Sequence, residues 1–444
     1  MAAEGGRSGT RNVGVGIIGW GTIGCGVIRL LREDADRLAE RLGARVELRG
    51  VADLDHDRRR EVRVPRSLLT RDARALIADP AIDVVVELMG GLEPARRFVL
   101  EALAAGKAVV TANKALLAHH GREIFAAAER ANVGFGFEAS VGGGIPIIRT
   151  LREALGSDTH RAVFGIVNGT SNFILSTMAA EGRGFAEVLA EAQRAGLAEA
   201  DPTYDVDGID AAHKLALLAQ LAFGVALPLD AVHAEGIRRI DAIDMEYARE
   251  FGFAIKLLAL ARDHGGEIEA RVQPAMIPAT DPLASVNGAF NAICLQSAAL
   301  GRTLYYGQGA GMMPTATAVV ADVLDVARDR MRGGPRLPPL GYPLAHQRRA
   351  RVRPTGALSA EYYLRIAVRD VPGVLGAIAG HLGRAGVSIA SVVQRAGRVG
   401  KGVPVVIRTH AAPEKDLRRA LARVAALETV LEPPVAIRIE NTSG

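Results

Sequence analysis

The sequence predicts an α/β protein: a doubly wound parallel sheet, then an α+β region, then a small ferredoxin-like βαββαβ unit. Three observations support this fold class. Short Val/Ile runs alternate with helical patterns up to about residue 140, which is typical of a parallel sheet with crossover helices. Residues 210–223 form a helical pattern that is apolar on nearly all sides, and such a helix is buried. Strand and helix patterns alternate again from residue 362 to the end.

Composition indicates a globular protein of two to four domains, with 444 residues of which 49% are apolar. The net charge is +5, but no basic run is interleaved with aromatic residues. We therefore expect solvated surface arginines and no nucleic-acid binding. Cys25 and Cys294 show neither metal-ligand spacing nor a disulfide framework, which favours a cytoplasmic location. No apolar run reaches membrane length, and residues 1–10 resemble a disordered end rather than a signal peptide.

A glycine-rich turn follows the first predicted strand, residues 12–18, and precedes a helix that we expect to extend to about residue 40. Its spacing, G-x-G-x-x-G, provides a tight turn, a close backbone approach to a pyrophosphate and close helix packing, and the helix N-terminus faces the phosphates. We therefore predict a Rossmann-type NAD(P) site. The nucleotide-binding residues of this turn would be Gly19, Gly21, Thr22, Ile23 and Gly24.

The second predicted strand, residues 46–52, ends at Asp53. A carboxylate at this place suits the ribose hydroxyl of NAD, whereas arginines suit the 2′-phosphate of NADP. Arg58, Arg59 and Arg60 follow closely and either meet that phosphate or form a solvated helix start. We expect both coenzymes to be accepted.

The next predicted strands are residues 83–88, 108–111 and 133–137. Ligands of such sheets bind at the carboxyl ends of the strands, so Gly90 and Lys114 should lie toward the nucleotide. Glu138 precedes a Gly-rich turn, residues 141–145. The backbone carbonyl oxygens of this turn would hold a hard cation, or the segment would serve only as a turn.

An acidic, turn-rich stretch from residue 196 leads into the apolar helix. Asp210 and Lys214 are four residues apart and so share one helix face. They form either a solvated ion pair or a catalytic pair, in which partial burial lowers the pKa of the lysine and prepares it to donate a proton. Further along, the Gly-rich turn 307–311 before a helix is either a second backbone approach to a ligand or a loop.

Residues 331–354 are rich in Gly, Pro and Arg and predict a linker. The βαββαβ unit after it comprises strands at 362–368, 387–393, 403–410 and 435–439, with helices from 370 and over 414–426.

These motifs together resemble the homoserine dehydrogenase family, in its bacterial, monofunctional form with a C-terminal ACT domain. The segments that carry the resemblance are GWGTIG, VVVELMGG, VVTANKALLA, FEASVGGGIPII, GIVNGTSNFIL, GLAEADPTYDVDGIDAAHKLALLA and GQGAGMMPTATAVVAD. The family reduces L-aspartate 4-semialdehyde to L-homoserine with NADPH or NADH. Many members carry an arginine immediately before the acidic residue after the second strand, and here that position is Ala52.

The resemblance implies roles for single residues. Lys214 would donate the proton, Asp210 and Glu199 would hold the substrate, and Lys114 would lie between nicotinamide and substrate. The remaining implied cofactor contacts are Gly90, Gly196 and Gly311. A sodium ion would be held near Glu138 by the carbonyls of Val141, Gly143 and Ile145.

The resemblance also implies an organisation: an NAD(P)-binding domain at 11–140, completed by part of 307–330, a substrate and dimerisation domain at 141–330, the linker, and an ACT domain at 355–444. We expect a homodimer or homotetramer with threonine as effector. We further expect a chain cut within the linker to retain catalysis and to lose inhibition.

Two other functions compete with this one. An amino-acid-binding regulatory protein without turnover would need the ACT-like unit alone, but the set Glu199, Asp210, Lys214 and Lys114 speaks against it. A different dehydrogenase, such as one acting on 3-phosphoglycerate, would use a His–carboxylate pair and substrate-binding arginines. An acidic loop suits an ammonium-bearing substrate better.

Overall fold

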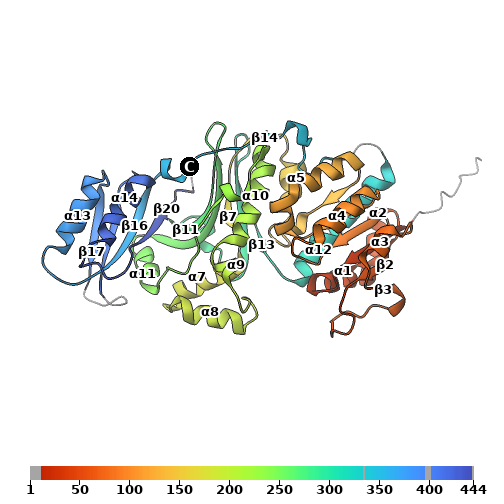
Figure 1. Ribbon diagram of the computed structural model, residues 1–444, viewed down its shortest axis with the longest axis horizontal. Coiled ribbons are helices and arrows are strands. Elements are labelled where there is room, and N and C mark those ends of the chain that lie inside the picture. The colour runs from red at the N-terminus through yellow and green to blue at the C-terminus, as the bar shows by residue number, and fades with distance from the viewer. Residues whose placement is uncertain (1–11, 334–335, 396–401, 443–444) are drawn as a thin grey trace, which may run out of the picture.

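The structure, a computed structural model, describes residues 12–333, 336–395 and 402–442, so the expectation for residues 1–10 lies outside it. Figure 1 shows three parts in a row, with the N-terminal part at the right, a large sheet in the middle and the C-terminal part at the left. Within the described residues, no helix combines the length and apolarity needed to cross a membrane.

The N-terminal part is built on a parallel sheet of order β3-β2-β1-β4-β5-β6, the order of a dinucleotide-binding fold. Its strands are β1 (Val13–Ile18), β2 (Val46–Ala52), β3 (Leu69–Thr70), β4 (Val84–Glu87), β5 (Ala108–Thr111) and β6 (Phe135–Gly136). Its helices are α1 (Thr22–Glu33), α2 (Ala35–Leu42), α3 (Ala73–Ala78), α4 (Ala95–Ala104), α5 (Lys114–Ala131) and, from much later in the chain, α12 (Met312–Arg332).

Two details differ from the expected pattern. The single helix expected up to residue 40 is two helices that meet at Asp34. The helix after the Gly-rich turn 307–311 returns to the first part and packs closely on α1, because a Cβ added at Gly26 would lie 2.8 Å from the Ala316 Cβ. The chain thus passes from the first part to the middle part and returns to the first part in α12.

The middle part is an antiparallel sheet of order β13-β12-β7-β10-β11. Its strands are β7 (His160–Ile166), β10 (Phe253–Asp263), β11 (Glu267–Pro278), β12 (Phe290–Ser297) and β13 (Gly301–Gln308), with the short β8 (Val225–Ala226) and β9 (His233–Ala234). Its helices are α6 (Ile147–Arg149), α7 (Gly169–Glu181), α8 (Phe185–Arg194), α9 (Thr203–Val206), α10 (Ile209–Phe223) and α11 (Ala242–Glu250). The sequence pattern did not resolve β10 to β13.

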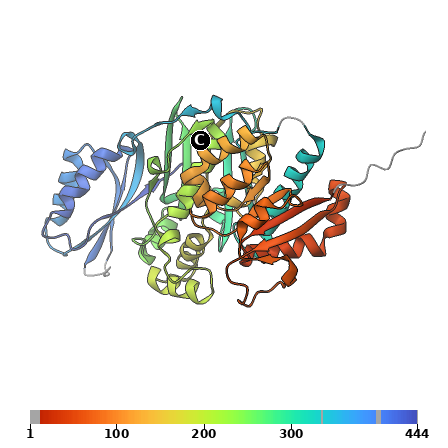
Figure 2. The ribbon, with the colours of Figure 1, turned by 45° about the vertical axis from the view of Figure 1, so that its right-hand side comes forward.

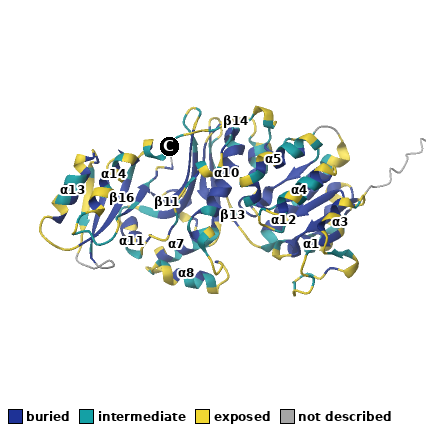
Figure 3. Ribbon diagram, viewed as in Figure 1, coloured by how far each residue is buried: buried dark blue, intermediate teal, exposed yellow. Residues whose placement is uncertain are grey.

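Helix α10 is the predicted apolar helix, and all of its residues except Ile209 and Ala222 are buried (Figure 3). It packs on β7, β10 and β11 on one side and on α5 on the other. Figures 1 and 2 both place α5, in orange, beside the green α10. The nucleotide-binding part and the substrate part therefore meet along these two helices.

The C-terminal part has the predicted βαββαβ order. It comprises β16 (Ser359–Val368), α13 (Val374–Arg384), β17 (Ile389–Gln394), β18 (Val403–Thr409), the short β19 (Ala412–Pro413), α14 (Glu414–Ala425) and β20 (Val435–Ile439). The helix expected from residue 370 begins at Val374, after a turn in which Gly373 has φ +89°.

The last strand joins the C-terminal part directly to the middle sheet. Strand β20 pairs with β16 on one side and in parallel with β11 on the other, with Ala275 opposite Arg438. Two buried ion pairs cross the joint: Arg271 Nη2 lies 2.5 Å from Glu440 Oε1, and Arg365 Nε lies 2.7 Å from Asp244 Oδ1.

Removing the C-terminal part would expose β11, take Glu440 from Arg271 and take Arg365 from Asp244. Because removing one partner of a buried ion pair is strongly destabilising, we expect the truncated chain to be less stable; that it retains catalysis and loses inhibition stays a prediction. The linker itself is held along the surface, since β14 (Arg348–Arg349) pairs with β8 and β15 (Arg351–Val352) pairs with β11.

Candidate active site

The predicted glycine turn has the geometry that a pyrophosphate requires. Gly19 has φ +105°, and a Cβ there would lie 2.7 Å from the carbonyl of Leu88. A Cβ at Gly24 would lie 2.4 Å from the Gly19 oxygen, whereas one at Gly21 would meet nothing within 4 Å. The first turn of α1, with Thr22 and Ile23, has no side-chain cap, so its amides are available to an anion. The residues present therefore fit a dinucleotide.

A cavity of about 420 Å³ opens beside this turn. Its lining includes Gly19, Gly21, Asp53, Leu54, Met89 and Phe98. The Gly90 turn is shaped by Glu87, a buried carboxylate that accepts hydrogen bonds from the amides of Met89 and Gly90 and from the Thr111 hydroxyl. Sequence reasoning missed Glu87; its signal was a carboxylate at the carboxyl end of a buried strand.

Two lysines from different parts of the chain meet at one buried carboxylate. Lys214 Nζ lies 2.7 Å from Asp210 Oδ2 and also donates to the Val167 carbonyl at 2.7 Å. Lys114 Nζ, from the start of α5, lies 3.2 Å from Asp210 Oδ1. The two ammonium groups therefore converge where α5 meets α10.

The polar surroundings of Asp210 include Asn168, which sequence reasoning missed. Asn168 Nδ2 donates to Asp210 Oδ2 at 2.9 Å and to Asp205 Oδ1 at 2.8 Å. The Asn168 side-chain oxygen accepts from the Ser171 amide and caps α7. An Asn directly before a helix is a capping signal, and this signal could have located it.

Burial and charge set the protonation of this pair. Burial raises the pKa of the Asp210 carboxyl, but the ammonium groups of Lys214 and Lys114 more than offset it, so the pKa lies below its ordinary value. Burial lowers the pKa of the Lys214 ammonium below its ordinary value of 10.5, although Asp210 opposes the shift. Asp210 is therefore an anion at neutral pH, and Lys214 releases its proton more readily than an exposed lysine.

His213, next to Lys214 in sequence, faces away from the ion pair. Its Nδ1 lies 2.5 Å from the Tyr204 hydroxyl oxygen, and its ring meets that of His119 edge-on at a centroid distance of 5.2 Å. Burial and the neighbouring His119 lower the pKa of His213 to about 4. A neutral histidine therefore lines the site without competing for Asp210.

The remaining predicted contacts are Glu199, Gly196 and Gly311. Glu199 is exposed, and the structure does not bring its carboxylate to Asp210; its backbone carbonyl accepts from the Gln193 amide at 3.0 Å. Gly196 has φ +71° with open space around it, and Gly311 has φ +121° directly before α12.

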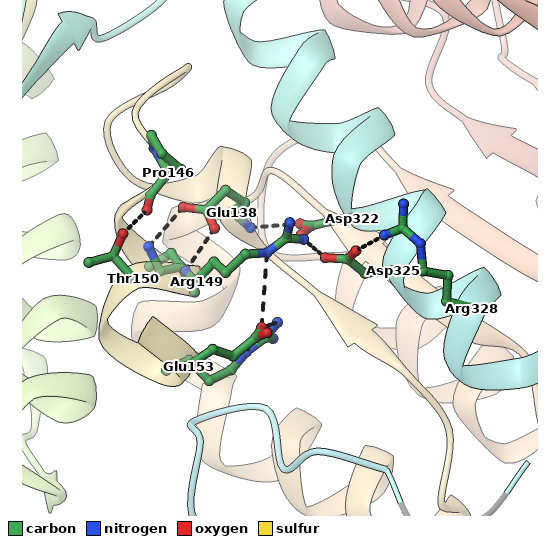
Figure 4. Close-up of polar contacts among 10 residues, drawn as sticks. Glu138, Pro146, Arg149, Thr150, Glu153, Asp322, Asp325 and Arg328 are labelled. Atoms are coloured by element: carbon green, nitrogen blue, oxygen red, sulfur yellow. Dashed lines mark hydrogen bonds and ion pairs between the residues drawn. The ribbon is translucent and has the colours of Figure 1, made fainter. Parts of the chain in front are cut away.

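Glu138 lies in a second buried cluster, between α6 and α12 (Figure 4). Its carboxylate accepts from the amides of Ile148 and Arg149 at 2.7 and 2.8 Å, and its own amide donates to Asp322. Burial and the nearby Asp322 carboxylate raise the pKa of Glu138 to about 7. The Arg149 guanidinium turns away to pair with Asp325.

The loop 141–145 lies against the turn before α12, because a Cβ at Gly143 would be 2.6 Å from the Gly309 carbonyl. The Ile145 oxygen accepts from the Ile147 amide, and Val141 is buried. No group of three or more His, Cys, Asp or Glu side chains that could hold a metal ion occurs among residues 12–333, 336–395 and 402–442.

The parallel sheet, the glycine turn and the lysine pair define a nicotinamide-dependent dehydrogenase. Residues 19–138 match the family model for the NAD binding domain of homoserine dehydrogenase, residues 146–324 the model for homoserine dehydrogenase, and residues 362–429 the ACT domain. The chain belongs to the homoserine dehydrogenase family, so it is an oxidoreductase that acts on a CH–OH group.

Similar proteins span nearly the whole chain. A homoserine dehydrogenase of Neisseria gonorrhoeae is 43% identical over 97% of this chain and 99% of its own length. The crystal structure of one from Thiobacillus denitrificans is 43% identical with a TM-score of 0.89, covering 97% and 98% of the two chains. A hyperthermophilic archaeal homoserine dehydrogenase in complex with NADPH is 25% identical with a TM-score of 0.59, covering 73% and 99%.

Proposed function

We propose that this protein reduces L-aspartate 4-semialdehyde to L-homoserine in the cytosol, on the route to threonine, methionine and isoleucine. The observation that carries the proposal is the convergence of Lys214 and Lys114 on Asp210. When bound, NADPH or NADH supplies the hydride, and the archaeal relative solved with NADPH supports a nicotinamide at the glycine turn.

The residues of this chain complete the reaction. Reduction of the aldehyde creates an oxyanion, which the Lys214 ammonium stabilises and protonates. Asp210 keeps that ammonium charged and oriented. Lys114 adds a second positive charge at the same place, between the nucleotide crevice and α10. Asp210 and Glu199 are proposed to meet the substrate ammonium, and Asp205 places a further carboxylate within reach of Asn168.

The test is a spectrophotometric assay of NADPH oxidation with aspartate semialdehyde and, in reverse, of NADP reduction with homoserine. Turnover of this pair but not of 3-phosphoglycerate is the expected result. A protein that binds the nucleotide and turns over neither substrate would overturn the proposal and favour a purely regulatory role.

We propose that Glu138, with the carbonyls of Val141, Gly143 and Ile145, holds a sodium ion. Glu138 is 5% exposed and its carboxylate accepts hydrogen bonds from two backbone amides, so a cation would stabilise its charged form. Sodium at ten times its dissociation constant should stabilise the protein by about 1.4 kcal/mol. Thermal unfolding in NaCl against N-methylglucamine chloride measures the effect.

The Glu138→Gln variant should lose the sodium response, and Glu153→Gln, an exposed carboxylate of the same cluster (Figure 4), should keep it. An equal response in both variants would contradict a site at Glu138.

We propose that threonine binds at the Gly373 turn of the C-terminal domain and inhibits the enzyme. The turn precedes α13, and Val371 and Leu375 beside it are exposed, which leaves backbone amides accessible to a carboxylate. In Gly373→Ala, the threonine concentration for half-inhibition should rise at least tenfold, which corresponds to about 1.4 kcal/mol of coupling. The kcat measured without threonine should not change.

Gly386→Ala is the matched control, because both glycines have positive φ and open space around the missing Cβ. Equal threonine sensitivity of the two variants, or an intact enzyme that ignores millimolar threonine, would contradict this site.

We also propose a homodimer or homotetramer. Strand β13 is an edge strand of the large sheet. The exposed side chains of Phe290, on β12, and Tyr306, on β13, stack there with ring centroids 5.2 Å apart. An exposed apolar sheet edge is a typical pairing surface. Light scattering of the purified chain measures the mass, and a monomer at micromolar concentration would contradict the proposal.

A further inference from the structure

Asp53, directly after β2, already has hydrogen-bond partners from within the chain. Asp53 Oδ2 accepts from the Trp20 amide at 2.7 Å, and Oδ1 accepts from the Asp55 amide and from Arg60 Nη2, both at 2.9 Å. The side chains of Asp53 and Arg60 are only 18% and 7% exposed. This carboxylate is therefore neutralised before any nucleotide arrives.

Arg60 is held in place by the phosphate-binding turn itself. Its Nε donates to the Trp20 carbonyl at 2.5 Å, and its guanidinium carbon lies 4.3 Å from the centroid of the Trp20 ring. Trp20 is 6% exposed and stands between Gly19 and Gly21. No helix forms at residues 58–60, so the interpretation of these arginines as a solvated helix start is wrong for Arg60.

The other arginines of the segment line, together with Trp20 and Arg60, a hollow of about 880 Å³. Its charged lining is His56, Arg58, Arg59, Arg60, Glu61, Arg63 and Arg66. The single carboxylate, Glu61, is paired with Arg29 at 3.3 Å. The hollow therefore carries an excess of positive charge, and one of its lining residues, Arg60, is the partner of Asp53.

We propose that Arg60 allows this acidic site to accept the 2′-phosphate of NADPH, by neutralising Asp53 and leaving Arg58 and Arg59 to meet the phosphate. A free carboxylate at this place accepts a ribose hydroxyl and repels a phosphate. Arg60 acts through Asp53 and is a specificity-determining, positioning residue. The proposal rests on the proposed nicotinamide-dependent function and adds to it the means of coenzyme selection.

The test measures equilibrium binding of NADPH and of NADH to the full chain by calorimetry, without substrate. Arg60→Met retains the stacking on Trp20 but frees the Asp53 charge, so NADPH binding should weaken at least tenfold while NADH binding changes less than threefold. Arg58→Met should also weaken NADPH binding selectively. Arg49→Met is the matched control, an exposed arginine of β2 paired with Glu47, and should change neither.

The decisive variant is Asp53→Asn combined with Arg60→Met, which removes both the carboxylate and its partner. NADPH binding should recover to within threefold of wild type, because no free charge remains. Equal loss of NADPH and NADH binding in Arg60→Met, no loss of either, or no recovery in the double variant would each overturn the proposal. A chain that shows the expected binding pattern but fails to reduce aspartate semialdehyde would overturn the proposed function alone.

Discussion

Lys214→Met is expected to lower kcat by about 10² to 10⁴-fold, the usual contribution of a general acid, while NADPH still binds. Methionine keeps the volume of the lysine stem inside α10 and removes only the ammonium. That ammonium is 2.7 Å from Asp210 Oδ2, and Asp210→Asn should also lose most of its activity. The two losses should be strongly non-additive, because the pair acts as one unit.

The pH dependence distinguishes a proton donor from a structural lysine. Burial lowers the pKa of Lys214, so the ammonium needed for reduction is lost as pH rises through this lowered value, and aldehyde reduction should fall at a pH below 10.5. Homoserine oxidation needs the neutral amine and should rise over the same range. Neither of these two pH dependences should remain in Lys214→Met.

A second buried lysine provides the control. Lys256 is 3% exposed and its Nζ donates to the Val286 carbonyl at 2.5 Å; burial lowers its pKa to about 8. Lys256→Met should change kcat less than threefold. If Lys214→Met retains more than about a third of the wild-type kcat, Lys214 is not the donor.

Local patterns predicted the fold and, at the candidate site, the contact between Asp210 and Lys214. The alternation of Val/Ile runs with helices requires a parallel sheet, and Gly19, Gly21 and Gly24 occupy positions that the backbone approach demands. The spacing of Asp210 and Lys214 fixes their contact, because residues four apart on a helix are neighbours.

Contacts between distant segments could not be predicted in this way. Lys114 was expected near the nucleotide, but its contact with Asp210 depends on how α5 packs against α10. The Arg60–Asp53 contact likewise depends on the path of an irregular loop. Glu199 was named for its charge and motif, whereas Asp205 is the carboxylate that the fold brings to Asn168.

The way in which the C-terminal part joins the middle sheet could not be predicted for a related reason. Gly, Pro and Arg between residues 331 and 354 predict a tether, and nothing in the pattern of β20 shows that it has two strand partners. Strand pairing is set by which edges meet in space, so the continuous sheet from β13 to β17 required the structure.

Arg271→Met is expected to destabilise the protein by about 3–5 kcal/mol, the usual cost of removing one partner from a buried ion pair. Arg271 is 0% exposed and bridges Glu269, at 2.6 Å from its Nε, and Glu440, at 2.5 Å from its Nη2. The variant would leave two buried carboxylates without this partner at the joint between β11 and β20. Chemical unfolding followed by circular dichroism measures the change.

The stability of the wild type and of the variant should depend on pH in a defined direction. Burial raises the pKa of Glu269, but Arg271, the hydrogen bond from His264 and the charge of Arg438 together more than offset this and hold it at about 2. In the wild type this group therefore contributes stability above its ordinary pKa of about 4.3, which is lost as pH falls toward 2. In Arg271→Met the pKa of Glu269 should rise, because the charge that lowers it most is gone, so the loss of stability should begin at a higher pH than in the wild type.

Arg351→Met is the matched control, an arginine of β15 beside the same strand whose side chain is 80% exposed and lies 3.9 Å from Glu267. Such a surface pair contributes roughly 0–1 kcal/mol. If the two variants unfold within about 1 kcal/mol of each other, the buried network around Arg271 does not hold the C-terminal part to the middle sheet.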